Sequence, residues 1–241
     1  MKAMILAAGL GTRLRPLTDS TPKALVTIKN RTLLEIIINR LKTFGINEMI
    51  INVHHFADHI IQYIKNNHFF NIRIEISKED NLLDTGGSLK KASWFFNDSD
   101  PFLLHNVDVL SNLDILQLLK FHKKNKAIAT LATRSRKTNR YFLTDLNNTL
   151  CGWESRQPDE KKIVRSPEGR LSRVSFMGIH MISPQLFSLF PSHEKFSIVD
   201  AYLTAAENHI IKTMPCDNSK WLDLGKPEQL NQAAGLFPEL F

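Results

Sequence analysis

The sequence alternates between short apolar runs typical of β-strands and amphipathic segments typical of α-helices, and this alternation constrains the fold more than any other feature. Strands are predicted at 2–8, 48–53, 71–76, 101–104 and 127–133. Helices are predicted at 57–65, at 113–122, and between an N-cap at Thr32 and a stop at Gly45. Strands joined by helices pair in parallel and are covered on both faces. The sequence therefore predicts an α/β fold with a mainly parallel sheet flanked by helices.

From about residue 140 the pattern changes. Strands predicted at 141–145, 150–154 and 173–181 follow one another without long helices between them, which indicates a smaller antiparallel lid or insertion. Helices return at 184–190, 197–208 and 227–236. Because the chain contains no linker, repeat or low-complexity tract, we expect a single domain over 1–241, with one lobe at 1–135 and a second at 136–241.

The composition is that of an ordinary globular protein. Of 241 residues, 43% are hydrophobic and 23% charged, which excludes disorder as the main state. No apolar run approaches the roughly 20 residues of a membrane span, and residues 3–10 are too short and wrongly flanked for a secretory signal. The two cysteines, Cys151 and Cys216, have no paired spacing. We therefore expect a protein without a membrane segment in the reducing cytoplasm.

The net charge of +7 leaves two interpretations open. Basic residues cluster at 120–126, 134–140 and 161–165, as they would in a nucleic-acid-binding protein. They would also cluster on solvated helix faces, or around a site for phosphorylated small molecules. Since no RNA-binding aromatic signature or helix-turn-helix pattern accompanies the charge, we expect no nucleic-acid partner.

A glycine-rich segment directly after the first strand carries the clearest chemical signal. It runs from Leu6 to Val26 and includes Gly9, Gly11 and Arg13, with Lys23 further on. A turn at this place lies at the carboxyl edge of a parallel sheet, where α/β folds bind ligands. Glycines let the backbone approach an anion closely, and the two cations suit phosphate.

Two familiar phosphate-binding loops do not fit this segment. The dinucleotide fingerprint requires a glycine where Leu14 stands, and the Walker loop requires a Gly-Lys-Ser/Thr ending that is absent. From the residues alone, a tight strand–loop turn with incidental surface cations stays open as the alternative.

Residues 6–26 resemble the signature of the sugar-1-phosphate nucleotidylyltransferases. That signature is Leu-Ala-Ala-Gly-x-Gly-Thr/Ser-Arg, followed by Pro-Leu-Thr and by Pro-Lys. The resemblance extends along most of the chain and is weakest from about 135 to 172. It is strongest to compact enzymes of the N-acetylmuramate-1-phosphate uridylyltransferase and mannose-1-phosphate guanylyltransferase types. The resemblance implies a Rossmann-like sheet with a smaller antiparallel lid, a nucleotide-binding lobe at 1–135, and a sugar-binding lobe with closing helices at 136–241.

Three further segments match the family. They are Leu83–Leu89, which contains Gly86 and Gly87 and is preceded by Glu79, then Phe102–Val109, and finally Trp221–Glu228. On their own, the first would indicate a helix start and the second an Asp cap after a strand. In the family the first segment binds the nucleobase, and the other two carry the aspartates that hold Mg²⁺. Val107 stands where the family usually has glycine.

The resemblance assigns each matching position a role. It implies nucleotide binding by Leu6, Ala7, Ala8, Gly9, Gly11, Thr12, Arg13, Glu79, Gly86 and Gly87. It implies catalytic roles for Arg13, Lys23 and Asp108, Mg²⁺ binding by Asp108 and Asp223, and sugar binding by Asn106, Glu154 and Gly178. The lysine and proline that often follow the family glutamate are Ser155 and Arg156 here.

The implied reaction is transfer of a nucleoside monophosphate from a nucleoside triphosphate to a sugar 1-phosphate, with Mg²⁺ as cofactor. The products would be pyrophosphate and a UDP- or GDP-sugar for cell-envelope polysaccharide. Two alternatives stay open: an enzyme resembling choline-phosphate cytidylyltransferase, which shares the run at 22–26, and a non-catalytic nucleotide-binding protein. The sequence does not determine the base, the sugar or the oligomeric state.

A cluster of histidines, His54, His55 and His59, offers a competing site. The last two have the i, i+4 spacing that occurs in helical zinc sites. Because no third ligand is evident and no glutamate lies between them, we expect structural or surface roles for these residues.

Overall fold

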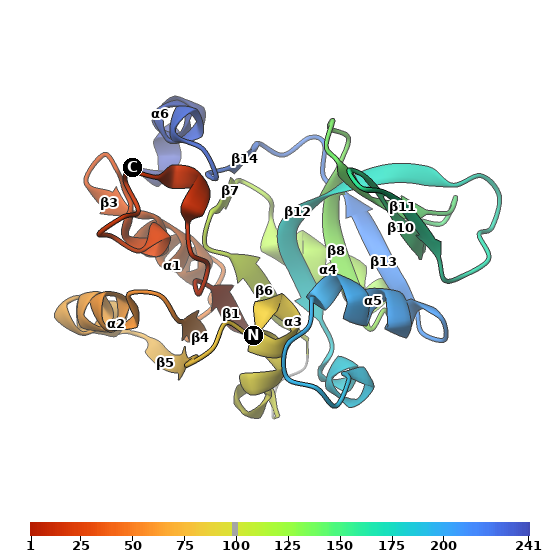
Figure 1. Ribbon diagram of the computed structural model, residues 1–241, viewed down its shortest axis with the longest axis horizontal. Helices are drawn as coiled ribbons and strands as arrows, with labels where there is room; N and C mark the ends of the chain where they lie inside the picture. Colours follow the sequence, from red (N-terminus) through yellow and green to blue (C-terminus); the bar gives the residue numbers. More distant parts are fainter. Residues whose placement is uncertain (98–100) are drawn as a thin grey trace.

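A computed structural model describes residues 1–97 and 101–241 (Figure 1). A ten-stranded mixed sheet runs through the molecule in the order β11-β10-β9-β12-β6-β1-β4-β5, with β8 and β13 attached beside β12. The neighbouring strands β5, β4, β1 and β6 pair in parallel, and β8 pairs in parallel with β13. These strands are β1 (Lys2–Leu6), β4 (Glu48–Val53), β5 (Arg73–Lys78), β6 (Phe102–Asn106), β8 (Ala129–Arg134) and β13 (Ile211–Pro215).

The antiparallel part lies at the right of Figure 1 and is joined to the rest by one long strand. That strand, β12, pairs with β6, β8 and β9. The predicted antiparallel insertion is therefore confirmed, but it extends the main sheet rather than forming a separate layer. Its strands are β9 (Arg140–Thr144), β10 (Leu150–Arg156), β11 (Asp159–Ile163) and β12 (Ser172–Ile182).

Helices cover both faces of the sheet, as the alternation predicts. Along β1, Ala3 and Ile5 enter one hydrophobic core and Met4 enters the other. The first core also contains α1, α2, α4 and α6, and the second contains α3 and α5. The helices are α1 (Leu33–Thr43), α2 (Ala57–Asn66), α3 (Asp84–Lys91), α4 (Ile115–Asn125), α5 (Ile198–Ala206) and α6 (Pro227–Leu236).

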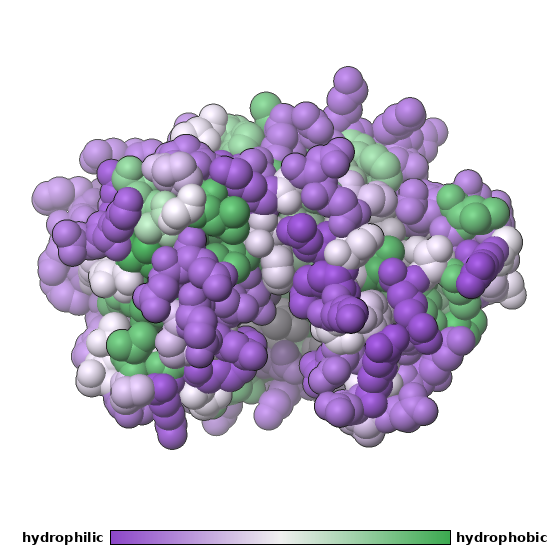
Figure 2. Space-filling view, turned by 90° about the horizontal axis from the view of Figure 1, so that it is seen from above, coloured by the Kyte–Doolittle hydropathy of each residue, from purple (hydrophilic) through white to green (hydrophobic). Residues whose placement is uncertain are grey.

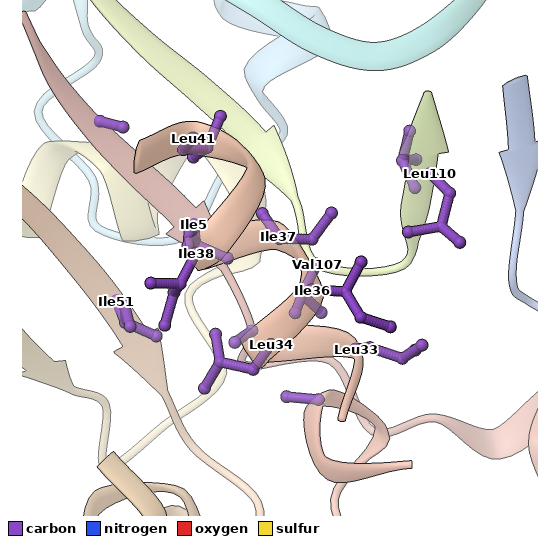
Figure 3. Close-up of a cluster of buried hydrophobic side chains, with 14 of the residues drawn as sticks. Ile5, Leu33, Leu34, Ile36, Ile37, Ile38, Leu41, Ile51, Val107 and Leu110 are labelled. Atoms are coloured by element: carbon purple, nitrogen blue, oxygen red, sulfur yellow. The ribbon is translucent and has the colours of Figure 1, made fainter. Parts of the chain in front are cut away.

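Helix α1 shows how the local sequence specifies an element. Thr32 Oγ1 accepts a hydrogen bond from the Glu35 N–H at 3.1 Å, so the predicted N-cap is confirmed. The Glu35 carboxylate accepts from the Tyr63 hydroxyl instead of closing a capping box. At the other end Gly45 adopts φ +74°, and the Ile46 N–H returns to the Leu41 carbonyl. Between these ends the helix points its apolar side chains at β1 and β4 (Figure 3).

Several boundaries and short elements differ from the prediction. The segment predicted as a helix at 184–190 is a 3₁₀-helix, η5 (Pro184–Leu189), and β1 ends at Leu6 rather than at residue 8. Helix α4 begins after Asp114, whose carboxylate caps it. The sequence interpretation also missed six strands. They are β11 and β13, whose bounds are given above, together with β2 (Thr27–Ile28), β3 (Arg31–Thr32), β7 (Val109–Ser111) and β14 (Trp221–Asp223).

Two of these short strands, β7 and β14, position the predicted Trp221–Glu228 segment. Strand β14 pairs antiparallel with β7 in a separate two-stranded sheet, with Asp223 opposite Val109. The two strands lie next to each other at the top of Figure 1. Helix α6 then packs against β2, so the end of the chain returns to its beginning. This return brings the Trp221–Glu228 segment to the carboxyl edge of the parallel strands.

The exterior is mostly polar. Figure 2 shows hydrophilic side chains dominating one face, with hydrophobic ones in small separate groups. A search of the described residues finds no helix that is both long and apolar enough to cross a membrane.

Two buried histidines on neighbouring strands predict how stability depends on pH. Burial lowers the pKa of His105 to about 4 and that of His180 to about 3, so both rings are neutral at pH 7. The unfolded chain has histidine pKa values near 6.5, so below that pH only the unfolded state takes up these protons. We expect the free energy of unfolding to fall as the pH falls from 6.5, by roughly 1.4 kcal/mol per pH unit and ring, until each native pKa is reached.

Urea unfolding between pH 7.5 and 5 measures this slope. His180→Gln should make it shallower, whereas replacement of the exposed His68 should not change it. A flat wild-type profile over this range would contradict neutral burial of the two rings.

Candidate active site

A cavity of about 570 Å³ opens at the carboxyl ends of β1, β4 and β6. This is the edge where the sequence predicts a ligand site. Ten of the predicted site residues line the cavity: Leu6, Ala7, Ala8, Gly9, Gly11, Thr12, Arg13, Lys23, Asn106 and Asp108. The structure thus brings together the glycine-rich segment, the loop after β6 and both predicted catalytic cations.

The glycine-rich loop is shaped by two glycines with different surroundings. Gly11 adopts φ +66°, and a Cβ there would lie 3.0 Å from Thr18. The Thr18 hydroxyl donates to the Gly11 carbonyl at 2.8 Å and holds this turn. A Cβ on Gly9 would meet no atom within 4 Å among the residues described. Gly11 therefore serves the conformation of the loop, whereas Gly9 leaves open space over the backbone for a ligand.

Behind the glycine-rich loop, the buried side-chain amide of Asn52 holds the loop backbone in position. Asn52, at the end of β4, accepts a hydrogen bond from the Ala7 N–H at 2.8 Å and donates to Glu79 at 2.8 Å. The second Glu79 oxygen accepts from the Leu83 N–H at 3.2 Å. Glu79 is only 2% exposed and does not line the cavity. Through its hydrogen bonds to Asn52 and to the Leu83 N–H, Glu79 connects the glycine-rich loop to the segment before α3.

Gly86 and Gly87 also lie away from the cavity, against the segment 194–196. Both N–H groups donate to the Phe196 carbonyl, at 3.0 and 3.2 Å. A Cβ on Gly86 would lie 2.4 Å from the Phe196 ring, and one on Gly87 would lie 2.0 Å from the Glu194 carbonyl oxygen. The described structure thus uses these glycines for close backbone packing, a role distinct from the base contact that the resemblance implies.

The segment that covers these glycines, residues 191–198, is fastened to α3 at several points. Lys90 Nζ donates to the carbonyls of Pro191, Ser192 and His193, at 2.6, 2.8 and 3.3 Å. The Ile198 N–H donates to Thr85 Oγ1 at 3.0 Å. We call residues 191–198 the strap. It carries Lys195 to the wall of the cavity.

The cavity wall also contains polar residues that had no individual prediction, three of them from the Leu83–Leu89 segment that the resemblance assigns to the base. Asp84, Thr85 and Ser88 line the cavity beside Lys195. Asp84 adopts φ +62°, an uncommon conformation for a residue with a side chain. The sequence pattern drew attention to the glycines two and three residues later, and no local pattern links Lys195 to a segment more than a hundred positions earlier.

Elsewhere on the cavity wall, charged residues of both signs lie close to Asp108. Lys23 Nζ is hydrogen-bonded to Asp108 Oδ2. The Leu224 N–H donates to the Asp108 carbonyl at 2.8 Å, which places Asp223 beside Asp108. Arg13 packs on the Gly225 backbone, where a Cβ would lie 2.7 Å from the guanidinium carbon. Three of the four predicted charged residues therefore line the cavity, and the backbone contact of Leu224 brings the fourth, Asp223, close to Asp108.

Asp223 has one feature that its neighbours lack. Its Oδ1 atom is buried and has no hydrogen-bond partner within residues 1–97 and 101–241. A buried carboxylate oxygen without a partner is costly unless a cation satisfies it. Oxygen ligands from two carboxylates suit Mg²⁺, which keeps further positions for water and substrate phosphates. Asp108 and Asp223 therefore fit the predicted metal.

The predicted sugar-binding residues are divided between two places. Gly178 adopts φ +78°, and a Cβ there would lie 2.9 Å from Asn106 Nδ2, so Gly178 makes room for the Asn106 side chain on the cavity wall. Glu154 lies outside that cavity, where it forms an ion pair with Arg173 through two guanidinium nitrogens. Its carboxylate is buried, with 6% of the residue exposed.

The histidine cluster has structural contacts. His54 Nδ1 is hydrogen-bonded to the Glu79 carbonyl at 2.9 Å. His55 and His59 flank Phe56, with ring centroids 4.0 and 5.3 Å from that ring. Each of the three histidines therefore has a structural contact within the folded chain.

Comparison with known proteins assigns the chain to a family. The pattern that defines the nucleotidyl transferases matches residues 2–237. The chain belongs to the nucleotidyl transferase family. It is 30% identical to a UTP–glucose-1-phosphate uridylyltransferase of Synechocystis, over 97% of this chain and 62% of that protein. It is 27% identical to the catalytic subunit beta of a mannose-1-phosphate guanylyltransferase of Dictyostelium discoideum, over 98% and 64%.

The chain thus spans about three fifths of the length of these curated relatives. Among solved structures, HddC from Yersinia pseudotuberculosis complexed with GMP-PN has the same fold. Its TM-score is 0.77 at 21% identity, covering 98% of this chain and 99% of that one. The predicted family and fold class are therefore confirmed.

The packing of the strap on α3 predicts opposite effects for two helical glycines. Gly87→Ala must displace the Glu194 carbonyl, so we expect a loss of about 1–3 kcal/mol in the free energy of unfolding. Gly235→Ala in α6 meets no atom within 4 Å among the residues described and should be neutral or stabilising by up to about 1 kcal/mol. Urea unfolding of both variants measures the difference, and equal stabilities would contradict the packing.

Proposed function

We propose that this protein transfers a nucleoside monophosphate from a nucleoside triphosphate to a sugar 1-phosphate and releases pyrophosphate. One observation carries the proposal: Arg13, Lys23 and Asp108 line one cavity with the glycine-rich loop, and the hydrogen bond from the Leu224 N–H to the Asp108 carbonyl brings Asp223 close to Asp108. The uridylyl- and guanylyltransferase relatives support this reaction. They do not support a choline-phosphate cytidylyltransferase, and a protein that only binds nucleotides has no need of the carboxylate pair.

The nucleotide would lie along the cavity with its phosphates at the charged end. The open backbone at Gly9 and the cations Arg13 and Lys23 suit a triphosphate. The base would then reach the end formed by Asp84, Thr85, Ser88 and Lys195. We propose these four residues as its surroundings, with Gly86 and Gly87 acting through the strap and Glu79 through Asn52.

Asp108 and Asp223 would hold the Mg²⁺ ion. When bound, the ion would neutralise negative charge on the phosphates. In the structure, Lys23 contacts Asp108. If the Asp108 carboxylate held the ion instead, the Lys23 ammonium group would be able to contact a phosphate oxygen. This exchange keeps Asp108 paired in both states, whereas Asp223 Oδ1 gains its partner only with the ion.

The proposed chemistry requires little beyond positioning and charge. An anionic oxygen of the sugar 1-phosphate attacks the α-phosphorus, a new P–O bond forms, and the bond between the α-phosphorus and the bridging oxygen to the β-phosphate breaks. The electron pair leaves with pyrophosphate. Since the attacking oxygen is already ionised, no general base is needed, and Arg13 and Lys23 would stabilise charge as the bond breaks.

We also propose that 1–135 acts as the nucleotide lobe and 136–241 as the sugar lobe of one domain, joined by β12. A cytoplasmic location fits the two unpaired cysteines, Cys151 and Cys216. Delivery of the product to cell-envelope polysaccharide stays a prediction.

A substrate matrix tests the proposed function. Four nucleoside triphosphates are combined with glucose, mannose and N-acetylmuramate 1-phosphates and with phosphocholine, and pyrophosphate release is measured with and without Mg²⁺. We expect release that depends on Mg²⁺ and on one sugar 1-phosphate, with UTP or GTP preferred. Release only with CTP and phosphocholine would establish the alternative enzyme, and the absence of release from every pair would refute transfer to these acceptors.

Arg13 and Arg15 form a matched pair for the same assay. Arg13 lines the cavity, whereas Arg15 is exposed and pairs with Asp19. Arg13→Ala should lower turnover by about 10²–10³-fold, because removal of one charge-stabilising donor typically has this effect. Arg15→Ala should stay near the wild-type rate. Normal pyrophosphate release by Arg13→Ala would remove that residue from the mechanism.

A further inference from the structure

The basic cluster at 134–140 has a part that the proposed function does not yet use. Arg136 lies over the indole ring of Trp221, with its Cζ 4.7 Å from the ring centroid, and Arg134 lies over the same ring at 5.7 Å. Trp221 belongs to β14, two residues before Asp223. The cluster that could have indicated a nucleic-acid partner thus places two of its guanidinium groups over a residue of the strand that carries Asp223.

The surrounding contacts hold this arrangement in place. Trp221 Nε1 donates to the Met177 carbonyl at 2.8 Å and fixes the indole. The Arg136 backbone carbonyl accepts from the Ser175 hydroxyl at 2.8 Å. One Arg136 side-chain nitrogen donates weakly to the Phe176 carbonyl at 3.4 Å, while the side chain stays accessible to solvent. A planar guanidinium held on an aromatic face keeps its remaining donors directed at a partner.

The charged groups around Arg136 would leave an excess of positive charge that an anion could compensate. Partial burial lowers the pKa of Arg136, Asp223 raises it, and the like charge of Arg134 lowers it. Asp223 is therefore the carboxylate that compensates Arg136 most. In the proposed function Asp223 is committed to a divalent cation, which would leave two neighbouring guanidinium groups beside further positive charge. A dianion would restore the balance.

Three other cations described above already have contacts of their own. Arg173 forms its ion pair with Glu154, and Lys23 contacts Asp108. Arg13 lies on Gly225 at the nucleotide side. Arg136 lies two residues beyond the end of β8, at the start of the second lobe, and interacts electrostatically with Asp223.

We propose that Arg136, seated on Trp221, binds the phosphate group of the sugar 1-phosphate and orients its attacking oxygen. This assignment rests on the proposed function, and it extends it by naming the group that holds the acceptor. A guanidinium that donates two parallel hydrogen bonds to a phosphomonoester fixes both its position and its rotation. The residue would act on the acceptor substrate and have no contact with the nucleotide.

The kinetic test compares Arg136→Gln and Arg136→Lys with the exposed neighbour Lys137→Gln. At saturating nucleotide, Arg136→Gln should raise the KM for the sugar 1-phosphate about 10- to 100-fold and leave the KM for the nucleotide within twofold. Arg136→Lys should recover part of the loss, because it restores the charge without the fork. An unchanged KM for the acceptor, or an equal change in Lys137→Gln, would overturn the assignment.

A binding measurement separates this inference from the proposed reaction. Calorimetric titration of the protein with glucose 1-phosphate, inorganic phosphate and neutral glucose needs no turnover. We expect both phosphates to bind the wild type, at least 10-fold more weakly to Arg136→Gln, and glucose not to depend on Arg136. If this holds while every substrate pair fails to release pyrophosphate, the proposed function is wrong and the phosphate site stands. If neither phosphate binds, or if binding is independent of Arg136, the inference is wrong.

Discussion

The pairing of β14 with β7 is the contact on which the candidate site depends. Only three residues of each strand take part, yet they join positions more than a hundred residues apart. The pairing sets Asp223 next to Asp108, brings Gly225 under Arg13, and supplies the indole that supports Arg136. Such a short ladder cannot be stable alone. It is supported by the Trp221 hydrogen bond to Met177 and by the packing of α6 against β14 and β2.

The site assembled by this contact is dominated by charge. Lys23 is hydrogen-bonded to Asp108 and lines the cavity with Arg13 and Lys195, while Arg136 interacts electrostatically with Asp223. Groups held in fixed positions need no reorganisation when negative charge shifts among phosphate oxygens, and this is the main source of catalysis in phosphoryl transfer. The rigid supports therefore matter as much as the charges: Asn52 under the glycine-rich loop, the strap on α3, and Trp221 under Arg136.

The sequence predicted the parts of the fold that local patterns encode. The N-cap at Thr32, the stop at Gly45 and the parallel strands all follow from short-range rules. Two of the missed strands share a physical reason, because β7 and β14 are three residues long and acquire their conformation from each other. Strand β11 is fully exposed and charged, so it lacks the alternation that identifies a half-buried strand.

The candidate site also divides into residues that sequence motifs indicate and residues whose position depends on tertiary structure. The residues of the glycine-rich loop and Lys23 were predicted because they lie within one continuous motif, whereas Asp108 and Asp223 were predicted through the family resemblance. Gly86 and Gly87 were recognised as special, but the reason in this structure is a backbone approach from residue 194, which no local pattern reveals. Lys195 and Arg136 could not be found in this way, since their proximity to the site depends entirely on tertiary structure.

We propose that the pairing of β7 with β14 brings the carboxylates of Asp108 and Asp223 together, so that they share one divalent cation. The most direct test is a double-mutant cycle on Asp108→Asn and Asp223→Asn, with Mg²⁺-dependent pyrophosphate release and melting temperature measured on the same samples. If the two act as a unit, each single variant should lose nearly all turnover, the double variant should be little worse than the poorer single one, and folding should survive. Near-normal turnover in either single variant, or multiplicative losses in the double variant, would contradict the shared site.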